Sequence, residues 1–246
     1  MNKADIAKAL KKDLSECRWL VRQKRFYGVL GTIAAKLSDH EFYPSVDKIF
    51  APFTILEKSP RLVIVATDPY PNEGMATGIP FAVSDSYEGR FPRSLEILKR
   101  VLPVGNGRRS DWIKWAREER VLLLNRSLTR FRCDRHATFG VWDRFIEAMI
   151  NEILCLNPEV VFWLMGDKAK HLNPFSAGKI TKDFGKQVIY SCHPSYVHCV
   201  GGAHCKCYKC FAVKRDRVIN LIRSRSCDSP KSRGCLITGE IENGDR

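Results

Sequence analysis

The sequence lacks a long hydrophobic run, and its longest apolar stretches cover only residues 62–66 and 160–165. A membrane-spanning helix needs roughly 18 or more consecutive apolar residues. The first residues, MNKADIAKALKKDLSE, mix acidic and basic side chains and lack the continuous apolar segment of a secretory signal. We therefore expect an intracellular protein of the nucleus or cytoplasm that does not bind membranes.

Acidic side chains are fewer than basic ones: the chain has 27 Asp and Glu against 41 Lys and Arg, which gives a net charge of 41 − 27 = +14. This excess favours a polyanionic partner, chiefly nucleic acid, through neutralisation of phosphates. An anionic membrane surface, or solubility alone, is the alternative. Hydrophobic residues make up 44% of the 246 residues, which excludes wholesale disorder and suits one large domain or at most two.

Cysteine is abundant, with ten residues. A chain of this size does not need a disulfide scaffold, so we expect mostly free thiols. Cysteine and histidine are concentrated in residues 198–210, where the spacing Cys-x-Cys-x-x-Cys lacks a clean second pair. Zinc remains the alternative for this segment, but we predict no metal and no cofactor.

The hydrophobic pattern predicts a three-layer α/β/α fold with a central, largely parallel four-stranded sheet. Four β-rich apolar runs, typical of strands buried on both faces, cover residues 62–65, 121–124, 160–164 and 188–190. Helical segments at residues 94–102 and 139–156 separate them. Residues 4–21 form an amphipathic pattern that predicts a helix, whose apolar stripe is Ile6, Leu10, Leu14, Cys17 and Val21.

Polar residues follow these predicted strands. Asp68 comes after the first run, Asn125 after the second and His193 after the fourth. Taken singly, they read as a turn residue, a helix cap and a loop histidine. Ligands of open parallel sheets bind beyond the carboxyl ends of the strands, so together these residues favour a site.

Three ordered motifs carry a family resemblance. Ala66-Thr67-Asp68-Pro69-Tyr70 leads to Gly78-Ile79-Pro80-Phe81, and these are followed by Leu122-Leu123-Leu124-Asn125 and His193-Pro194-Ser195-Tyr196-Val197. In this order and spacing they resemble the motifs of the family I uracil-DNA glycosylases, including the poxvirus-like branch. The resemblance implies a catalytic domain at residues 43–222, preceded by an N-terminal helical extension at residues 1–42. A polar tail covers residues 223–246.

The implied activity is hydrolysis of the N-glycosidic bond of uracil in DNA after base flipping, which leaves an abasic site for base excision repair. By resemblance, Asp68 orients the water and supports the cationic sugar, while His193 donates a hydrogen bond to uracil O2. Phe81 stacks on the base, and Tyr70 stands against its C5 edge. Asn125 presents a donor and an acceptor that match uracil and mismatch cytosine.

The resemblance also implies DNA contacts beyond the pocket. Ser94 and Ser195 bind phosphates beside the flipped nucleotide, and Tyr196 or Val197 fills the gap in the base stack. The expected substrate is uracil-containing DNA, single- or double-stranded. Replication or repair proteins are further predicted partners.

Three positions depart from the usual family pattern. Thr67 stands in place of Gln and Pro71 in place of His, which predicts weaker positioning of the water and slower turnover. The Asp-Pro-Tyr-Pro form is similar to poxvirus-type enzymes and suggests a viral origin. Tyr196 stands in place of Pro, which favours single-stranded substrate. These departures keep open an alternative function, a DNA-binding replication accessory protein on a glycosylase scaffold with weak or no catalysis.

Overall fold

The computed structural model describes residues 1–246 except 73, 134–138, 171–187, 198–207 and 225–246. Its centre is a sheet of four parallel strands in the order β3-β2-β5-β6. The strands are β2 (Leu62–Ala66), β3 (Val121–Asn125), β5 (Val161–Met165) and β6 (Val188–Ser191). Every residue of β2, β3 and β5 is buried. The continuous apolar runs reflect this burial on both faces, and the predicted α/β class is confirmed.

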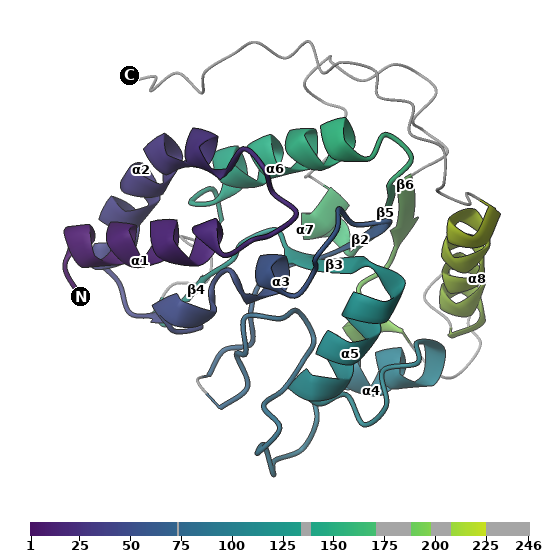
Figure 1. Cartoon of the computed structure of the whole chain (residues 1–246). Coiled ribbons are helices and arrows are strands. Elements are labelled where there is room, and N and C mark those ends of the chain that lie inside the picture. Colours follow the sequence, from purple (N-terminus) through teal and green to yellow (C-terminus); the bar gives the residue numbers. More distant parts are fainter. Residues whose placement is uncertain (73, 134–138, 171–187, 198–207, 225–246) are drawn as a thin grey trace.

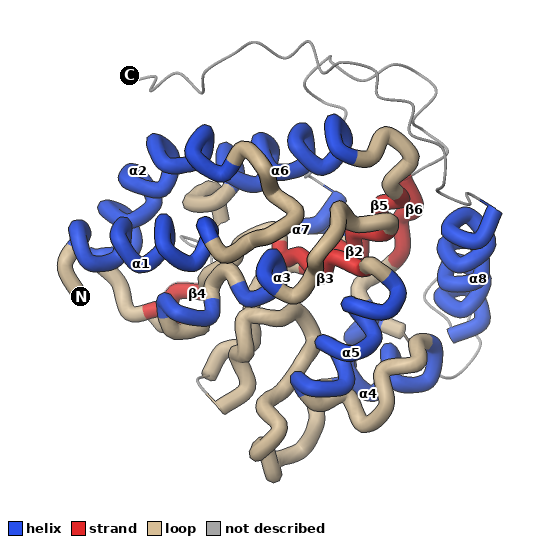
Figure 2. Tube along the Cα trace, in the orientation of Figure 1, coloured by secondary structure: helices blue, strands red, loops and turns tan. Residues whose placement is uncertain are grey.

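Helices cover the sheet on both sides (Figures 1 and 2). Figure 1 shows α2 (Tyr27–Ser38) and α6 (Asp143–Leu156) above the strands, α1 (Lys3–Ser15) to the left beside α2, and α4 (Arg93–Val101) and α5 (Arg109–Glu119) below. The remaining elements are α3 (Ala51–Thr54), α7 (Asp167–Lys170), α8 (Tyr208–Ser224), the short strands β1 (Phe42–Tyr43) and β4 (Arg130–Phe131), and the 3-10 turns Gln23–Phe26, Val46–Lys48 and Pro194–Tyr196.

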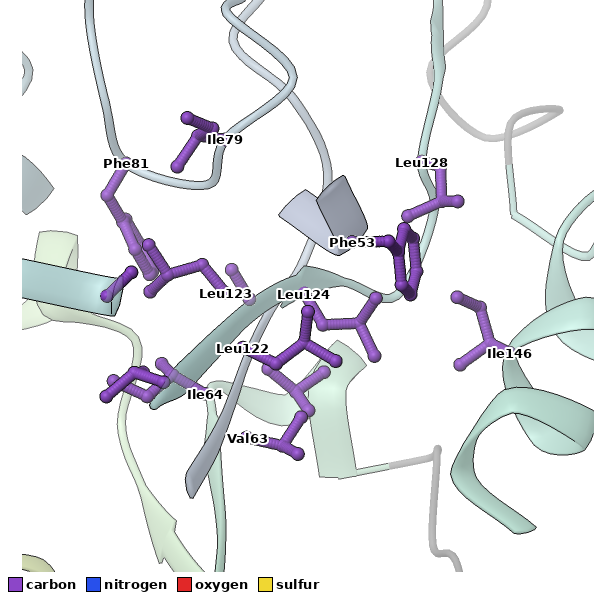
Figure 3. Close-up of a cluster of buried hydrophobic side chains, with 14 of the residues drawn as sticks. Phe53, Val63, Ile64, Ile79, Phe81, Leu122, Leu123, Leu124, Leu128 and Ile146 are labelled. Carbon is purple, nitrogen blue, oxygen red and sulfur yellow. The ribbon is translucent and has the colours of Figure 1, made fainter. Parts of the chain in front are cut away.

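The core lies between these layers and reaches the edge of the sheet where the strands end. Figure 3 shows side chains of β2 and β3 packed together with Phe53 and Ile146 from the helices. At the other side of the same cluster lie Ile79 and Phe81, which belong to the long loop after β2. The loop is therefore anchored by apolar burial.

The N-terminal helices are tied to the body by a buried carboxylate. Glu152 of α6 is fully buried, and its oxygens accept hydrogen bonds from Arg22 Nε at 2.9 Å and Arg25 Nη1 at 2.7 Å. Both arginines lie in the connection between α1 and α2. A buried carboxylate requires such pairing, because an unpaired charge in the core is strongly unfavourable.

The first helix is shorter than the prediction for residues 4–21. It ends at Ser15, where the Glu16 N–H bonds to the carbonyls of the last turn. The chain then turns toward α3, and both Cys17 Sγ and Trp19 Nε1 donate to the Phe53 carbonyl, at 3.2 and 2.9 Å. Cys17 is buried as expected, but the side chain of Val21 is 76% exposed, so its placement on the apolar stripe was wrong.

Other differences concern element boundaries and thiols. Helix α6 begins at Asp143, four residues later than predicted. Of the cysteines whose side chains the structure describes, Cys17, Cys133 and Cys192 are free and Cys155 is disulfide-bonded. Residues 198–207, on which the zinc alternative mainly depends, lie outside the described residues. None of the described helices combines the length and apolarity that a membrane crossing requires.

Candidate active site

A cavity of about 130 Å³ opens at the carboxyl ends of the strands. It is smaller than the roughly 300–1,000 Å³ of sites for drug-sized ligands, so it suits a single small ring. Its walls come from the ends of β2, β3 and β6, the loop after β2, and the start of α4. The lining residues are Ala66, Asp68, Pro69, Tyr70, Ala76, Thr77, Gly78, Ile79, Pro80, Phe81, Ser94, Asn125, Arg130 and His193. Six predicted site residues are among them: Asp68, Tyr70, Phe81, Ser94, Asn125 and His193.

Asp68 stands two residues beyond β2. Its side chain is 4% exposed, and Oδ2 lies 3.2 Å from Arg130 Nη1. The backbone around it continues the pairing of the sheet, because Arg126 N donates to the Ala66 carbonyl and Ser127 N donates to the Thr67 carbonyl. The carboxylate is therefore held on a rigid backbone and is almost excluded from solvent.

Asn125 is the last residue of β3 and pairs in register with Ala66 of β2. Its side chain is buried, and Oδ1 has no hydrogen-bond partner within the described part of the chain. A buried amide oxygen without a partner is costly in a folded protein. Because Asn125 lines the cavity, this oxygen is an acceptor available to a ligand that brings its own donor.

Phe81 forms an aromatic wall under backbone strain. Its φ is +66°, a region that bulky side chains rarely adopt. The ring packs at 6.2 Å from the Trp112 ring and 5.9 Å from the His193 ring, measured between centroids. Three residues earlier, Gly78 has a φ of +80°, and a Cβ there would lie 1.9 Å from the Lys48 carbonyl oxygen. Only glycine fits this close approach, which fixes the course of the loop.

Tyr70 spans the cavity between the loop and α4. Its hydroxyl donates to the Phe81 carbonyl at 3.1 Å and lies 3.4 Å from Ser94 Oγ. Burial raises the pKa of Tyr70 far above its ordinary value, against the smaller lowering effect of the hydrogen bond with Ser94. The hydroxyl therefore stays neutral, and the ring is a fixed part of the wall. Ser94 itself is buried.

His193 follows β6, and its ring is oriented by its own turn. Nδ1 lies 2.8 Å from Ser195 Oγ and accepts a hydrogen bond from the Ser195 N–H at 3.3 Å. An Nδ1 that accepts cannot carry the proton of a neutral imidazole, so the proton is on Nε2. The neutral ring can then donate from Nε2. This assigns Ser195 a role in orienting His193 in addition to the predicted phosphate contact.

The two residues predicted to fill the gap in the base stack (the wedge), Tyr196 and Val197, have opposite surroundings. Tyr196 is 61% exposed and its ring lies 6.4 Å from that of His193. Val197 is fully buried, and its carbonyl accepts a hydrogen bond from Arg93 Nη2 at 2.9 Å. The prediction that the Val197 side chain contacts DNA does not fit this burial, because a core side chain cannot insert into a base stack. Tyr196 alone is placed to do so.

Two residues of the site were missed by sequence reasoning. Arg130 enters the cavity from β4, and no sequence motif marks it. Gly166, directly after β5, has a φ of +88°, and a Cβ there would lie 2.9 Å from His193 Cβ. Its position at a strand end was the available signal. Across the described residues there is no group of three or more His, Cys, Asp or Glu side chains able to hold a metal ion.

The family model described as "Uracil DNA glycosylase superfamily" matches residues 53–211. The uracil-DNA glycosylase of Streptococcus mutans is 35% identical over 159 residues, which cover 62% of this chain and 69% of that protein. The Streptococcus pneumoniae (strain P1031) uracil-DNA glycosylase is 35% identical over 162 residues, with the same coverage.

Solved structures share the fold at lower sequence identity. The mimivirus uracil-DNA glycosylase aligns with a TM-score of 0.54 and 19% identity, over 74% of this chain and 73% of that one. The wild-type UNG of Nitratifractor salsuginis aligns with a TM-score of 0.52 and 17% identity, over 84% of this chain and 95% of that one.

Proposed function

The chain belongs to the uracil-DNA glycosylase superfamily, and we propose that its cavity excises uracil from DNA by hydrolysis of the N-glycosidic bond, leaving an abasic site for base excision repair. The observation that carries this proposal is the convergence of Asp68, Asn125 and His193, which lie at or just beyond the carboxyl ends of β2, β3 and β6, on one small cavity. The alternative, a DNA-binding replication accessory protein with weak or no catalysis, finds no support among the relatives described above.

The burial of Asp68 implies that the target nucleotide leaves the helix before the reaction. A base inside a duplex cannot reach a buried carboxylate, so it is flipped out, and single-stranded substrate avoids the cost of unpairing. In the cavity Phe81 stacks on the uracil ring, whereas Tyr70 faces its C5 edge, where a thymine methyl group would clash. The strained Phe81 backbone is consistent with a position kept for binding.

Asn125 selects uracil over cytosine by hydrogen bonding. Its unpartnered Oδ1 accepts from uracil N3–H, and its amide NH₂ donates to O4. Cytosine has an acceptor at N3 and a donor at C4, so it would leave both groups of the amide unpaired in a buried site. Discrimination of this kind can reach about 10⁴-fold.

The chemistry requires stabilisation of two opposite charges. As the bond breaks, the sugar gains oxocarbenium character and the departing uracil becomes anionic near O2. The Asp68 carboxylate stabilises the cation and orients the attacking water, in a site where little solvent screens its charge. His193 donates from Nε2 to O2, because its Nδ1 already accepts from Ser195.

Contacts outside the cavity place the DNA strand. Ser94 and Ser195 bind phosphates beside the flipped nucleotide, and the exposed ring of Tyr196 fills the gap in the stack. We further propose that the enzyme is of the family I type with a poxvirus-like motif, on the basis of Asp68-Pro69-Tyr70-Pro71. Replication or repair proteins are its proposed partners, and the nucleus or cytoplasm its proposed location.

The proposed function is tested by base selectivity. Oligonucleotides identical except for one uracil, thymine, cytosine or hypoxanthine are incubated with the protein, and abasic sites are cleaved with alkali. We expect cleavage at uracil alone. The Tyr70→Ala variant should gain cleavage at thymine, whereas Tyr70→Phe should not, because only the former removes the ring at the C5 edge. Equal cleavage of all four bases, or none at uracil, would contradict the proposal.

A further inference from the structure

Arg130 places a positive charge inside the proposed active site. Its Nη1 lies 3.2 Å from Asp68 Oδ2, and the two side chains are 23% and 4% exposed. Both residues line the cavity. A cation in contact with the carboxylate that faces the sugar requires an explanation, since a positive charge there also repels the oxocarbenium centre.

The backbone of Arg130 is fixed from several directions. In the antiparallel ladder of β1 and β4, Arg130 pairs with Tyr43. The preceding Thr129 is fully buried, and its hydroxyl accepts a hydrogen bond from Trp142 Nε1 at 2.8 Å. The following Phe131 stacks on His40 at 4.1 Å between ring centroids. The guanidinium therefore extends from a rigid frame toward Asp68.

Other arginines near this segment have different surroundings. Arg132, two residues on, pairs with Glu41 at 2.8 Å, but the two side chains are 61% and 73% exposed. Exposed pairs of this kind contribute little to stability, because water and salt screen the attraction. The Arg130–Asp68 pair is shielded from solvent, so its interaction is screened much less.

The charge balance of the reaction gives Arg130 a purpose. At bond breakage the cavity holds the Asp68 carboxylate, the cationic sugar and the anionic uracil. Without a further cation, Asp68 repels the departing anion as strongly as it attracts the sugar at equal distance. With the guanidinium on the carboxylate, the four charges sum to zero, and the carboxylate is held in one orientation by a charge-assisted hydrogen bond.

We propose that Arg130 is a positioning residue for Asp68, which orients the carboxylate toward the sugar and balances its charge while uracil departs. This inference rests on the proposed function. Thr67 and Pro71 stand where the usual motif has Gln and His, so a side chain from another element supplies the orientation of Asp68 in this chain. Arg130 acts through Asp68, and its removal should lower the rate of bond cleavage more than the binding of DNA.

The test uses single-turnover excision from a single-stranded oligonucleotide with one uracil. The full-length variants are Arg130→Gln, Arg130→Lys, Asp68→Asn and the double variant Arg130→Gln/Asp68→Asn, with Arg132→Gln as the matched control. We expect Arg130→Gln to lower the rate at saturating enzyme by about 10–100-fold, the cost of a misplaced catalytic group. The enzyme concentration that gives half of the maximal rate (half-saturation) should change less than about threefold. Arg130→Lys should recover part of the rate lost in Arg130→Gln, and Arg132→Gln should match the wild type.

The double variant separates positioning from an independent role. If Arg130 acts through Asp68, the double variant is no slower than Asp68→Asn. A further loss equal to that of Arg130→Gln alone would overturn the proposal, as would an Arg130→Gln rate equal to wild type. A higher enzyme concentration at half-saturation with an unchanged maximal rate would indicate that Arg130 contacts a phosphate, and would also overturn the proposal. If the wild type excises no uracil, the proposed function fails and the inference with it, whereas an active wild type confines any failure to Arg130.

Should Arg130→Gln lose its folded structure by circular dichroism, Arg130→Lys carries the test. Lysine keeps the charge but lacks the planar fork that holds a carboxylate in one orientation. A rate between wild type and Asp68→Asn, with half-saturation unchanged, supports positioning. A wild-type rate in a folded Arg130→Lys variant would show that orientation by the guanidinium is not needed.

Discussion

Gly166 lies directly against His193, and a Cβ built on Gly166 would be only 2.9 Å from His193 Cβ. The Gly166 N–H donates to the Ser191 carbonyl at 2.9 Å, so the chain after β5 is bound to the end of β6. The position of the imidazole is thus set by the absence of a side chain on the neighbouring strand as well as by its own turn.

The Gly166→Ala variant should therefore move His193. The new methyl group clashes with the histidine, and the φ of +88° is unfavourable for alanine. We expect excision to fall by about 10–100-fold and the free energy of unfolding by about 1–3 kcal/mol. Gly31→Ala in α2 is the control, because nothing lies within 4 Å of its Cβ position. Full excision by a folded Gly166→Ala protein would show that His193 tolerates the displacement.

Replacing Glu152 should loosen the N-terminal helices. Glu152→Gln keeps the shape of the side chain but removes the buried charge that pairs with Arg22 and Arg25. Because both arginines retain some access to water, we expect a loss of about 2–3 kcal/mol in unfolding free energy. Urea denaturation measures it, with exposed Glu147→Gln on the same helix as the control. Equal stabilities of the two variants would show that the pairing contributes nothing net.

Tyr196 should matter more for duplex than for single-stranded substrate. In a duplex, its exposed ring takes the place of the flipped base between the neighbouring bases. A single strand has less base stacking, so the loss of the ring matters less there. We expect Tyr196→Ala to lower excision from a duplex by about tenfold and from a single strand by less than about twofold. Val213→Ala, also exposed but on α8, is the control. The same loss on both substrates would assign Tyr196 to the pocket instead of the wedge.

The Asp85 carboxylate should give α5 a pH-dependent stability. Hydrogen bonds from the Ser110 N–H and hydroxyl, at 3.0 and 2.7 Å, lower the pKa of Asp85 below its ordinary value of 3.8. Because the folded-state pKa is depressed, the stabilisation is complete above the ordinary pKa and is lost as pH falls through the folded value. The wild type should melt above Asp85→Ala at pH 7, by a small margin that begins to narrow below about pH 4 and closes as pH falls through the folded-state pKa. A margin independent of pH would mean that the ionised form is not needed.

The sequence predicted the layers of the fold because strands buried on both faces appear as unbroken apolar runs. Ala66 and Asn125 lie side by side in the sheet, so residues after those runs had to meet at one edge. Helix ends were less predictable. The apolar pattern continues at helical spacing as far as Val21, yet the helix ends at Ser15. The chain leaves the helix there, and Trp19 hydrogen-bonds to the Phe53 carbonyl, 34 residues further along the sequence.

Site residues that belong to sequence motifs were predicted, whereas a site residue that is placed only by tertiary packing was missed. Tyr70, Phe81 and Asn125 line the cavity, as the resemblance implies for uracil-binding residues. Arg130 could not be predicted from the sequence, because its approach to Asp68 depends on the pairing of β1 with β4. Strands of two residues are too short to show a hydrophobic period. Val197 was misplaced for a similar reason: its carbonyl is bound by Arg93 of α4, a residue far away in the sequence.

The role of Asp68 is tested most directly by uracil release from one single-stranded oligonucleotide in EDTA, measured side by side for wild type and Asp68→Asn. We expect the wild type to leave alkali-labile sites and Asp68→Asn to be slower by at least about 100-fold while its affinity for DNA is kept. Equal excision by both proteins would contradict the role of Asp68. Binding without excision by either protein would contradict the glycosylase function itself.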